Sequence, residues 1–75
     1  MLGRGPEAQL EWLQRDVKAK PPRALDWLTA REQMNLWRLY RVSTGDESAA
    51  HVVFEDASDL RLREHALLVL SLIHI

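Results

Sequence analysis

Apolar residues recur along the first part of the chain at spacings of three and four, the period of a helix with one buried face. Leu10, Leu13 and Val17 follow this spacing. Pro6 precedes them and suits the first turn of a helix, where its missing N–H costs nothing. The pattern predicts a helix that starts near Pro6 and ends by Lys20, because the proline that follows Lys20 disfavours helical conformation in the residue before it.

The next segment carries the clearest signal for the start of a helix. Thr29 and Glu32 have the spacing of a capping box, in which each side chain binds the other residue's backbone N–H. This predicts a helix over residues 30–42, preceded by a short helical turn over residues 23–28. Apolar side chains fall on two flanks of the longer helix, so we expect it to pack against two neighbours at the centre of the domain.

The last third of the chain is predicted to add two further helices. Asp46 can cap a short helix, although residues 52–54 are β-branched and aromatic and fit a strand equally well. Ser58 can cap a final helix, in which residues 66–73 are apolar on nearly every side. Such a helix must be buried, and the preceding residues offer little to cover it. The sequence predicts an all-α fold, a small bundle of four to five short helices that forms an incomplete domain.

The length of the chain makes residues 1–75 a single helical module. Its apolar ending indicates the N-terminal part of a longer protein. The final Leu-Ser-Leu-Ile-His-Ile resembles translated sequencing-adapter sequence, so residues 71–75 are expected to be a tail foreign to the protein. Leu68 and Leu72 would lie outside the buried stripe of the last helix. We therefore expect the isolated chain to self-associate.

Charge and cysteine content narrow the classes of function. Ten Lys plus Arg oppose eleven Asp plus Glu, and this balance argues against a broad basic surface for nucleic acid or anionic lipid. There are no cysteines to form a disulfide or a thiolate ligand. The apolar ending is too short to span a bilayer, and the start lacks the apolar stretch of a secretory signal. We expect a cytoplasmic protein with no membrane segment.

Candidate catalytic chemistry is sparse. His51 lies four residues from both Glu47 and Glu55, so the three would share one face of a helix. No nucleophile motif, phosphate-binding glycine loop or metal-ligand spacing accompanies them. We therefore predict a non-enzymatic protein that uses no cofactor and no metal. A fragment of an enzyme whose site lies downstream stays open as an alternative.

One stretch resembles a family of DNA-binding regulators. Residues 28–33, Leu-Thr-Ala-Arg-Glu-Gln, resemble the opening of the four-helix DNA-binding domains of LuxR-type regulators, and Arg63-Glu-His65 resembles their third-helix signature. This resemblance implies a helix-turn-helix DNA-binding regulator as the alternative function. Asn35 and Arg38 stand where that family has apolar residues, which ranks DNA binding second.

Protein binding is the leading prediction, in the form of a helical interaction or regulatory module. Trp12 lies opposite the apolar stripe of the first predicted helix, and exposed tryptophans beside arginines are typical anchors of interfaces. The expected partner is another protein or the missing remainder of the same chain, with nucleic acid ranked lower. The candidate partner-binding residues are Trp12, Arg15, Lys18, Lys20, Arg23, Leu68 and Leu72.

Overall fold

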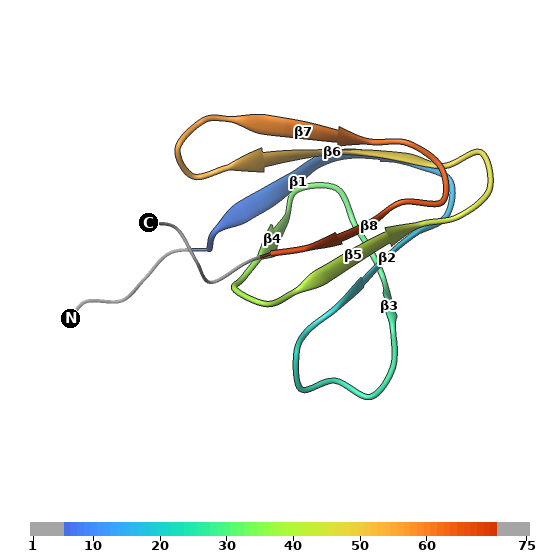
Figure 1. The fold of residues 1–75 in the computed structure, drawn as a ribbon, viewed down its shortest axis with the longest axis horizontal. Helices are drawn as coiled ribbons and strands as arrows, with labels where there is room; N and C mark the ends of the chain where they lie inside the picture. The colour runs from blue at the N-terminus through green and yellow to red at the C-terminus, as the bar shows by residue number, and fades with distance from the viewer. Residues whose placement is uncertain (1–5, 71–75) are drawn as a thin grey trace.

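A computed structural model describes residues 6–70, and the prediction of an all-α bundle is wrong: these residues form strands and turns, with no helix (Figure 1). The fold is all-β. The strands are β1 Ala8–Gln14, β2 Val17–Lys20, β3 Leu28–Thr29, β4 Met34–Leu36, β5 Arg41–Thr44, β6 Ala49–Phe54, β7 Asp59–Leu62 and β8 Leu67–Val69.

The strands form two antiparallel sheets of four strands each. Sheet A has the order β4-β1-β6-β7, and sheet B has the order β3-β2-β5-β8. Strand β1 continues into β2, and β5 continues into β6, so each of these long segments contributes to both sheets. The two segments pair along their length, with Gln14 opposite Ala49 in sheet A and Val17 opposite Thr44 in sheet B. The whole domain is therefore one antiparallel arrangement that is folded over on itself (Figure 1).

Four bends carry the chain from one sheet to the other, and each contains a residue with left-handed backbone conformation. The bends are residues 15–16, 30–33, 45–48 and 63–66. The left-handed residues are Arg15, Gln33, Glu47 and His65, with φ of 64°, 66°, 50° and 58°. None of them is a glycine, although this conformation is uncommon for residues with a Cβ atom.

The two halves of the chain repeat the same plan. Arg15 and Glu47 are 32 positions apart, and so are Gln33 and His65. The strand pairing is also unchanged when β1, β2, β3 and β4 are exchanged for β5, β6, β7 and β8 respectively. Residues 8–36 and residues 41–69 are thus related by an approximate two-fold arrangement, which exchanges sheet A with sheet B.

The core lies between the two sheets and is built from alternate residues of the strands. Leu10, Leu36 and Val52 come from sheet A, and Val17 and Val42 come from sheet B; each is 2% exposed or less. Successive side chains of a strand point to opposite faces, so this alternation buries one face of each sheet. We call the face that points away from the core the outer face.

The helical spacing of Leu10, Leu13 and Val17 has a different origin in the structure. Leu10 pairs with Val52 and Trp12 pairs with His51, so Glu11 is the extra residue of a β-bulge. The bulge lets Leu10 and Leu13 face the same side although they are three residues apart. The bend at residues 15–16 then returns Val17 to the core. A bulged and bent strand thus reproduces the spacing of a helix.

The capping box is also wrong. Thr29 ends strand β3, and Glu32 lies in the bend that follows. The predicted helix over residues 30–42 is instead β4, a turn at residues 37–40, and the start of β5. Leu39 in that turn has a φ of 68°, which no right-handed helix permits.

The last two predicted helices are strands as well. Residues 52–54 belong to β6, so the strand alternative is the correct one there. The apolar run that begins at Ala66 forms β8, in which Leu67 and Val69 are exposed and Leu68 is half-buried. The argument for an incomplete domain required a helix apolar on nearly every side, and residues 66–70 form no such helix. Residues 71–75 lie outside the described part of the chain.

Candidate functional site

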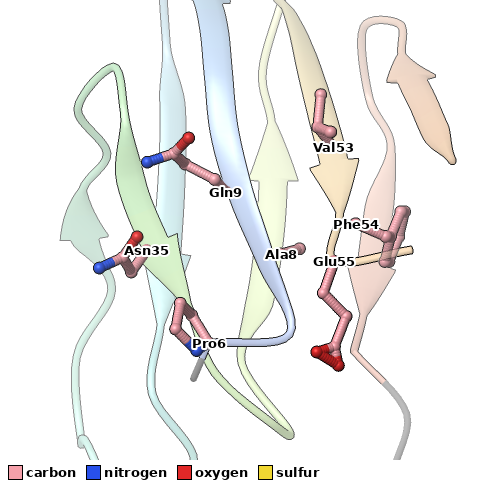
Figure 2. Close-up of a pocket in the computed structure, with 7 residues that line it drawn as sticks. All are labelled: Pro6, Ala8, Gln9, Asn35, Val53, Phe54 and Glu55. Carbon is pink, nitrogen blue, oxygen red and sulfur yellow. The ribbon is translucent and has the colours of Figure 1, made fainter. Parts of the chain in front are cut away.

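The outer face of sheet A is the best candidate for a functional surface. Figure 2 shows Asn35, Gln9 and Val53 on the neighbouring strands β4, β1 and β6, and the strand register places them in one row. Among the paired residues of this face, the Asp and Arg side chains belong to the edge strand β7. The paired residues of the outer face are Gln9, Trp12, Gln14, Asn35, Ala49, His51, Val53, Asp59 and Arg61.

A second row on this face combines an aromatic ring, an imidazole and a guanidinium. Trp12 of β1 lies opposite His51 of β6, and His51 lies opposite Arg61 of β7. These three residues and Ala50 line an open hollow of about 310 Å³. Trp12 is 45% exposed although it lies on a central strand. The bulge at Glu11 explains its position, because a bulge re-aims the side chain that follows it.

The polar groups of this row differ in whether they are already paired. His51 Nε2 lies 2.7 Å from Asp59 Oδ2, which holds the orientation of the imidazole. Arg61 forms no ion pair or hydrogen bond within residues 6–70. Its guanidinium therefore remains able to bind a carboxylate in the bidentate geometry that arginine favours. The row offers a ring for stacking next to a site for a carboxylate.

A second hollow adjoins the first row of this face (Figure 2). It measures about 300 Å³. Gln9 lies at its border, and its Nε2 donates a hydrogen bond to the backbone oxygen of Gln33 at 3.2 Å. Its lining residues are Pro6, Ala8, Gln9, Asn35, Val53, Phe54 and Glu55. Two hollows on one face suit a ligand that is longer than a single side chain.

The structure separates Trp12 from the basic residues that sequence reasoning grouped with it. Lys18 and Lys20 lie on β2 in sheet B, and Arg23 lies in the loop between β2 and β3. Arg15 lies in the first bend, with its Nη1 3.7 Å from Glu47 Oε1. Lys18 Nζ is 3.1 Å from Asp16 Oδ1. The expected cluster around the two prolines is therefore not one surface with Trp12.

Of the two candidate leucines near the C-terminus, Leu68 and Leu72, only Leu68 lies within the described residues. Leu68 lies on the inner side of β8, opposite the fully buried Val42, and its neighbours Leu67 and Val69 are the exposed residues of this strand. Leu72 lies outside the described residues.

Sequence reasoning did not find His51 and Arg61 as neighbours of Trp12. It grouped His51 with Glu47 and Glu55 on a helix, whereas the structure pairs it with Asp59. Cross-strand neighbours are fixed by register, and residues 39 positions apart in the chain, such as Trp12 and His51, become adjacent. The one local signal is the alternation of charged and apolar residues in Asp59-Leu60-Arg61-Leu62, which is typical of a strand with one exposed face.

The His51–Asp59 pair does not by itself make a catalytic site. A base and its orienting carboxylate need a nucleophile or a bound substrate group within reach, and the hollow is lined by Trp12, Ala50, His51 and Arg61. Within residues 6–70, no group of three or more His, Asp or Glu side chains is placed to hold a metal ion. The arrangement is suited to binding by stacking and hydrogen bonding.

No protein-family model, curated protein or solved structure matches the chain. The β-fold corrects both functions that were built on helices. Residues 28–33 form β3 and the bend that follows it, and residues 63–65 lie in the bend between β7 and β8. Neither a helical interaction module nor a helix-turn-helix regulator is compatible with this structure. The described residues also include no helix of the length and apolarity needed to cross a bilayer.

Proposed function

We propose that this β-domain is a non-enzymatic protein-binding module, and that it takes a segment of a partner protein on the outer face of sheet A. The observation that carries the proposal is the half-exposed Trp12 on a central strand, in one row with an unpaired Arg61. Tryptophan and arginine are among the residues that are enriched at the energetic hot spots of protein interfaces. The cytoplasmic location expected from the sequence stays a prediction.

The charges of this face favour a protein over a nucleic acid. The paired residues on β4, β1 and β6 include no Asp, Glu, Lys or Arg, and charge-depleted centres are typical of protein interfaces. Asp59 lies at the edge of the face, and the exposed Glu11 precedes Trp12 in the bulge. A phosphate backbone would meet these carboxylates, and Arg61 is the one Lys or Arg side chain in the row of Trp12, His51 and Arg61. Binding to polyanions relies on several such cations.

The geometry defines the chemistry of the partner segment. An aromatic or proline side chain would stack on Trp12, and a carboxylate beside it would bind Arg61. The adjoining hollow, bordered by Asn35 and Gln9, would receive a further side chain of the same segment. The predicted ligand is therefore an extended peptide that holds an aromatic residue or proline next to an aspartate or glutamate.

Selection from a random peptide library tests this proposal. The 75-residue chain is used as bait, and the affinities of the selected peptides are measured by calorimetry for the wild type and two variants. Trp12→Ala should weaken binding by about 30-fold or more, which corresponds to roughly 2 kcal/mol. Trp27→Ala is the matched control, because Trp27 is similarly exposed, at 39%, but lies in the loop between β2 and β3. It should change the affinity less than about twofold.

Two results would overturn the proposal. One is a set of selected peptides that bind Trp12→Ala as tightly as the wild type while both proteins remain folded by circular dichroism. The other is saturable binding of a single-stranded oligonucleotide at physiological salt that is lost in Trp12→Ala, which would make this face a nucleic-acid site. Arg61→Gln adds a finer test. Peptides selected with this variant should lack the acidic residue, because its arginine partner is gone, and should keep the aromatic residue or proline that stacks on Trp12.

A further inference from the structure

The four edge strands of the two sheets differ in how well they are protected from pairing with another strand. Strand β3 has two residues, and β7 presents Asp59 and Arg61 on its outer face. Strand β4 presents Asn35. Short length, charges and polar side chains are the usual devices that prevent pairing at an edge. Strand β8 has none of these devices beyond its three-residue length, since Leu67, Leu68 and Val69 are all apolar.

The backbone of β8 also points two pairs of hydrogen-bonding groups away from the sheet. The backbone oxygen of Ala66 accepts from the Thr44 N–H, and Leu70 exchanges hydrogen bonds with Tyr40 and Leu39. Backbone groups alternate in direction along an antiparallel strand, so those of Leu67 and Val69 point away from β5. Within residues 6–70, these outward backbone groups of Leu67 and Val69 have no hydrogen-bond partner. The side chains of Leu67 and Val69 are 62% and 46% exposed.

The approximate two-fold arrangement of the chain gives this edge an internal reference. Strand β4 is the counterpart of β8, and Asn35 lies 32 positions before Leu67. Each is an exposed residue on an edge strand of its sheet. The same position therefore carries an amide on one edge and an apolar side chain on the other. The Leu67 side chain contributes little to the packing of sheet B, because it points away from the core and is mostly exposed.

We propose that β8 is a homodimerisation edge, at which the β8 strands of two copies of this chain pair antiparallel about a two-fold axis through Leu68. In this register Leu67 of each copy lies opposite Val69 of the other. The outward N–H and C=O groups of these residues then form four hydrogen bonds between the copies. Sheet B continues into the second copy as a single sheet of eight strands.

The second copy fits this edge better than an unrelated strand because the segment is self-complementary. Residues 66–70 carry no charge, so antiparallel pairing brings no like charges together. The two-fold axis keeps inner faces with inner faces, and it places Leu67 of one copy beside Val69 of the other on the outer face. The interface is small compared with the ~1,200–2,000 Å² of stable complexes, so the dimer is a weak one. It does not use the outer face of sheet A.

Sedimentation equilibrium of the full 75-residue chain over a wide concentration range tests the dimer. The wild type should fit a monomer–dimer equilibrium. Leu67→Lys should raise the dissociation constant by about tenfold or more, because each dimer receives two lysines at its centre. Asn35→Lys is the matched control, since it adds the same charge at the counterpart position on β4. It should leave the equilibrium unchanged within about twofold.

Amide hydrogen exchange identifies the edge directly. The amides of Leu67 and Val69 should become protected as the protein concentration rises, while the exposed amides of β4 should not. If Leu67→Lys fails to fold, Val69→Lys supplies the same test, because Val69 of each copy lies opposite Leu67 of the other and the variant again places two lysines at the centre of the dimer. A monomer at every concentration would overturn the proposal. So would an association that Leu67→Lys leaves intact, or one that proceeds beyond the dimer without a plateau.

Discussion

The outer faces of the two sheets carry opposite kinds of surface on the same scaffold. On sheet A, an aromatic row of Trp12, His51 and Arg61 lies beside uncharged amides and aliphatic residues. On sheet B, Lys18 and Lys20 of β2 lie next to Arg41 and Ser43 of β5, and the edge strand adds two exposed aliphatic side chains. The approximate two-fold arrangement relates the backbones of the two sheets but not these surfaces.

This difference shows which positions the fold constrains. The inner positions of both sheets are mainly apolar, with Thr44 as a buried polar exception, since both sheets close one core. The outer positions are free of that requirement, and their side chains differ between the two sheets. Lys20 lies directly opposite Arg41, a pairing of like charges that costs stability. On sheet A the unfavourable feature is the exposure of the apolar Trp12 ring to solvent. Surface positions that do not serve the core are where a binding function is to be sought.

The largest expected effect tests whether the two sheets share one core. Leu10→Ala removes a fully buried side chain of sheet A and should cost about 2–5 kcal/mol. A domain of this size has a stability of only a few kcal/mol, so the variant should be largely unfolded. Urea denaturation followed by circular dichroism measures the loss, and amide exchange reports each sheet. Trp12→Ala, on the opposite face of the same strand, should remain folded. Persistent protection of β2 and β5 in Leu10→Ala would mean that the sheets are independent.

A smaller effect is expected where the chain crosses between the sheets. Thr44 is a buried polar residue; its Oγ1 donates to the backbone oxygen of Arg63 and accepts from the Ala66 N–H at 2.8 Å. Thr44→Val keeps the shape but leaves both backbone groups without this partner, which should cost about 1–3 kcal/mol. Ser43→Val, at the adjacent half-buried position facing outward, is the control. Equal urea midpoints for the two variants would show that the bend at residues 63–66 does not depend on Thr44.

The smallest expected effect concerns the like-charge pair on sheet B. Arg41→Glu places a carboxylate opposite Lys20, and opposite charges at such positions contribute roughly 0.2–1 kcal/mol. The variant should therefore unfold at a slightly higher urea concentration than the wild type. Arg38→Glu makes the same change of charge in the turn between β4 and β5 and should give no comparable gain. If both variants shift the midpoint equally, net charge and not the cross-strand pair is responsible.

Some properties of this protein follow from the sequence alone. The balanced charge and the lack of cysteine can be read directly, and so can the scarcity of catalytic or metal-binding spacings. The sequence also predicts that Trp12 lies on the face opposite to Leu10 and Leu13. The structure has this arrangement, because the bulge at Glu11 separates these side chains in the same way as a helix would. The strand alternative for residues 52–54 also follows from the sequence, since β-branched residues favour strands.

The choice between helix and strand was decided only by the tertiary structure. Spacings of three and four between apolar residues arise from a helix, and they arise equally from strands that are bulged and bent. The bends lie at Arg15, Gln33, Glu47 and His65, residues that give no local signal because none is a glycine. Contacts far apart in the sequence join neighbouring bends, such as the hydrogen bond from the Gly45 N–H to the Asp16 oxygen at 2.9 Å. The row of Trp12, His51 and Arg61 exists for the same reason: strand register joins residues that the sequence keeps far apart.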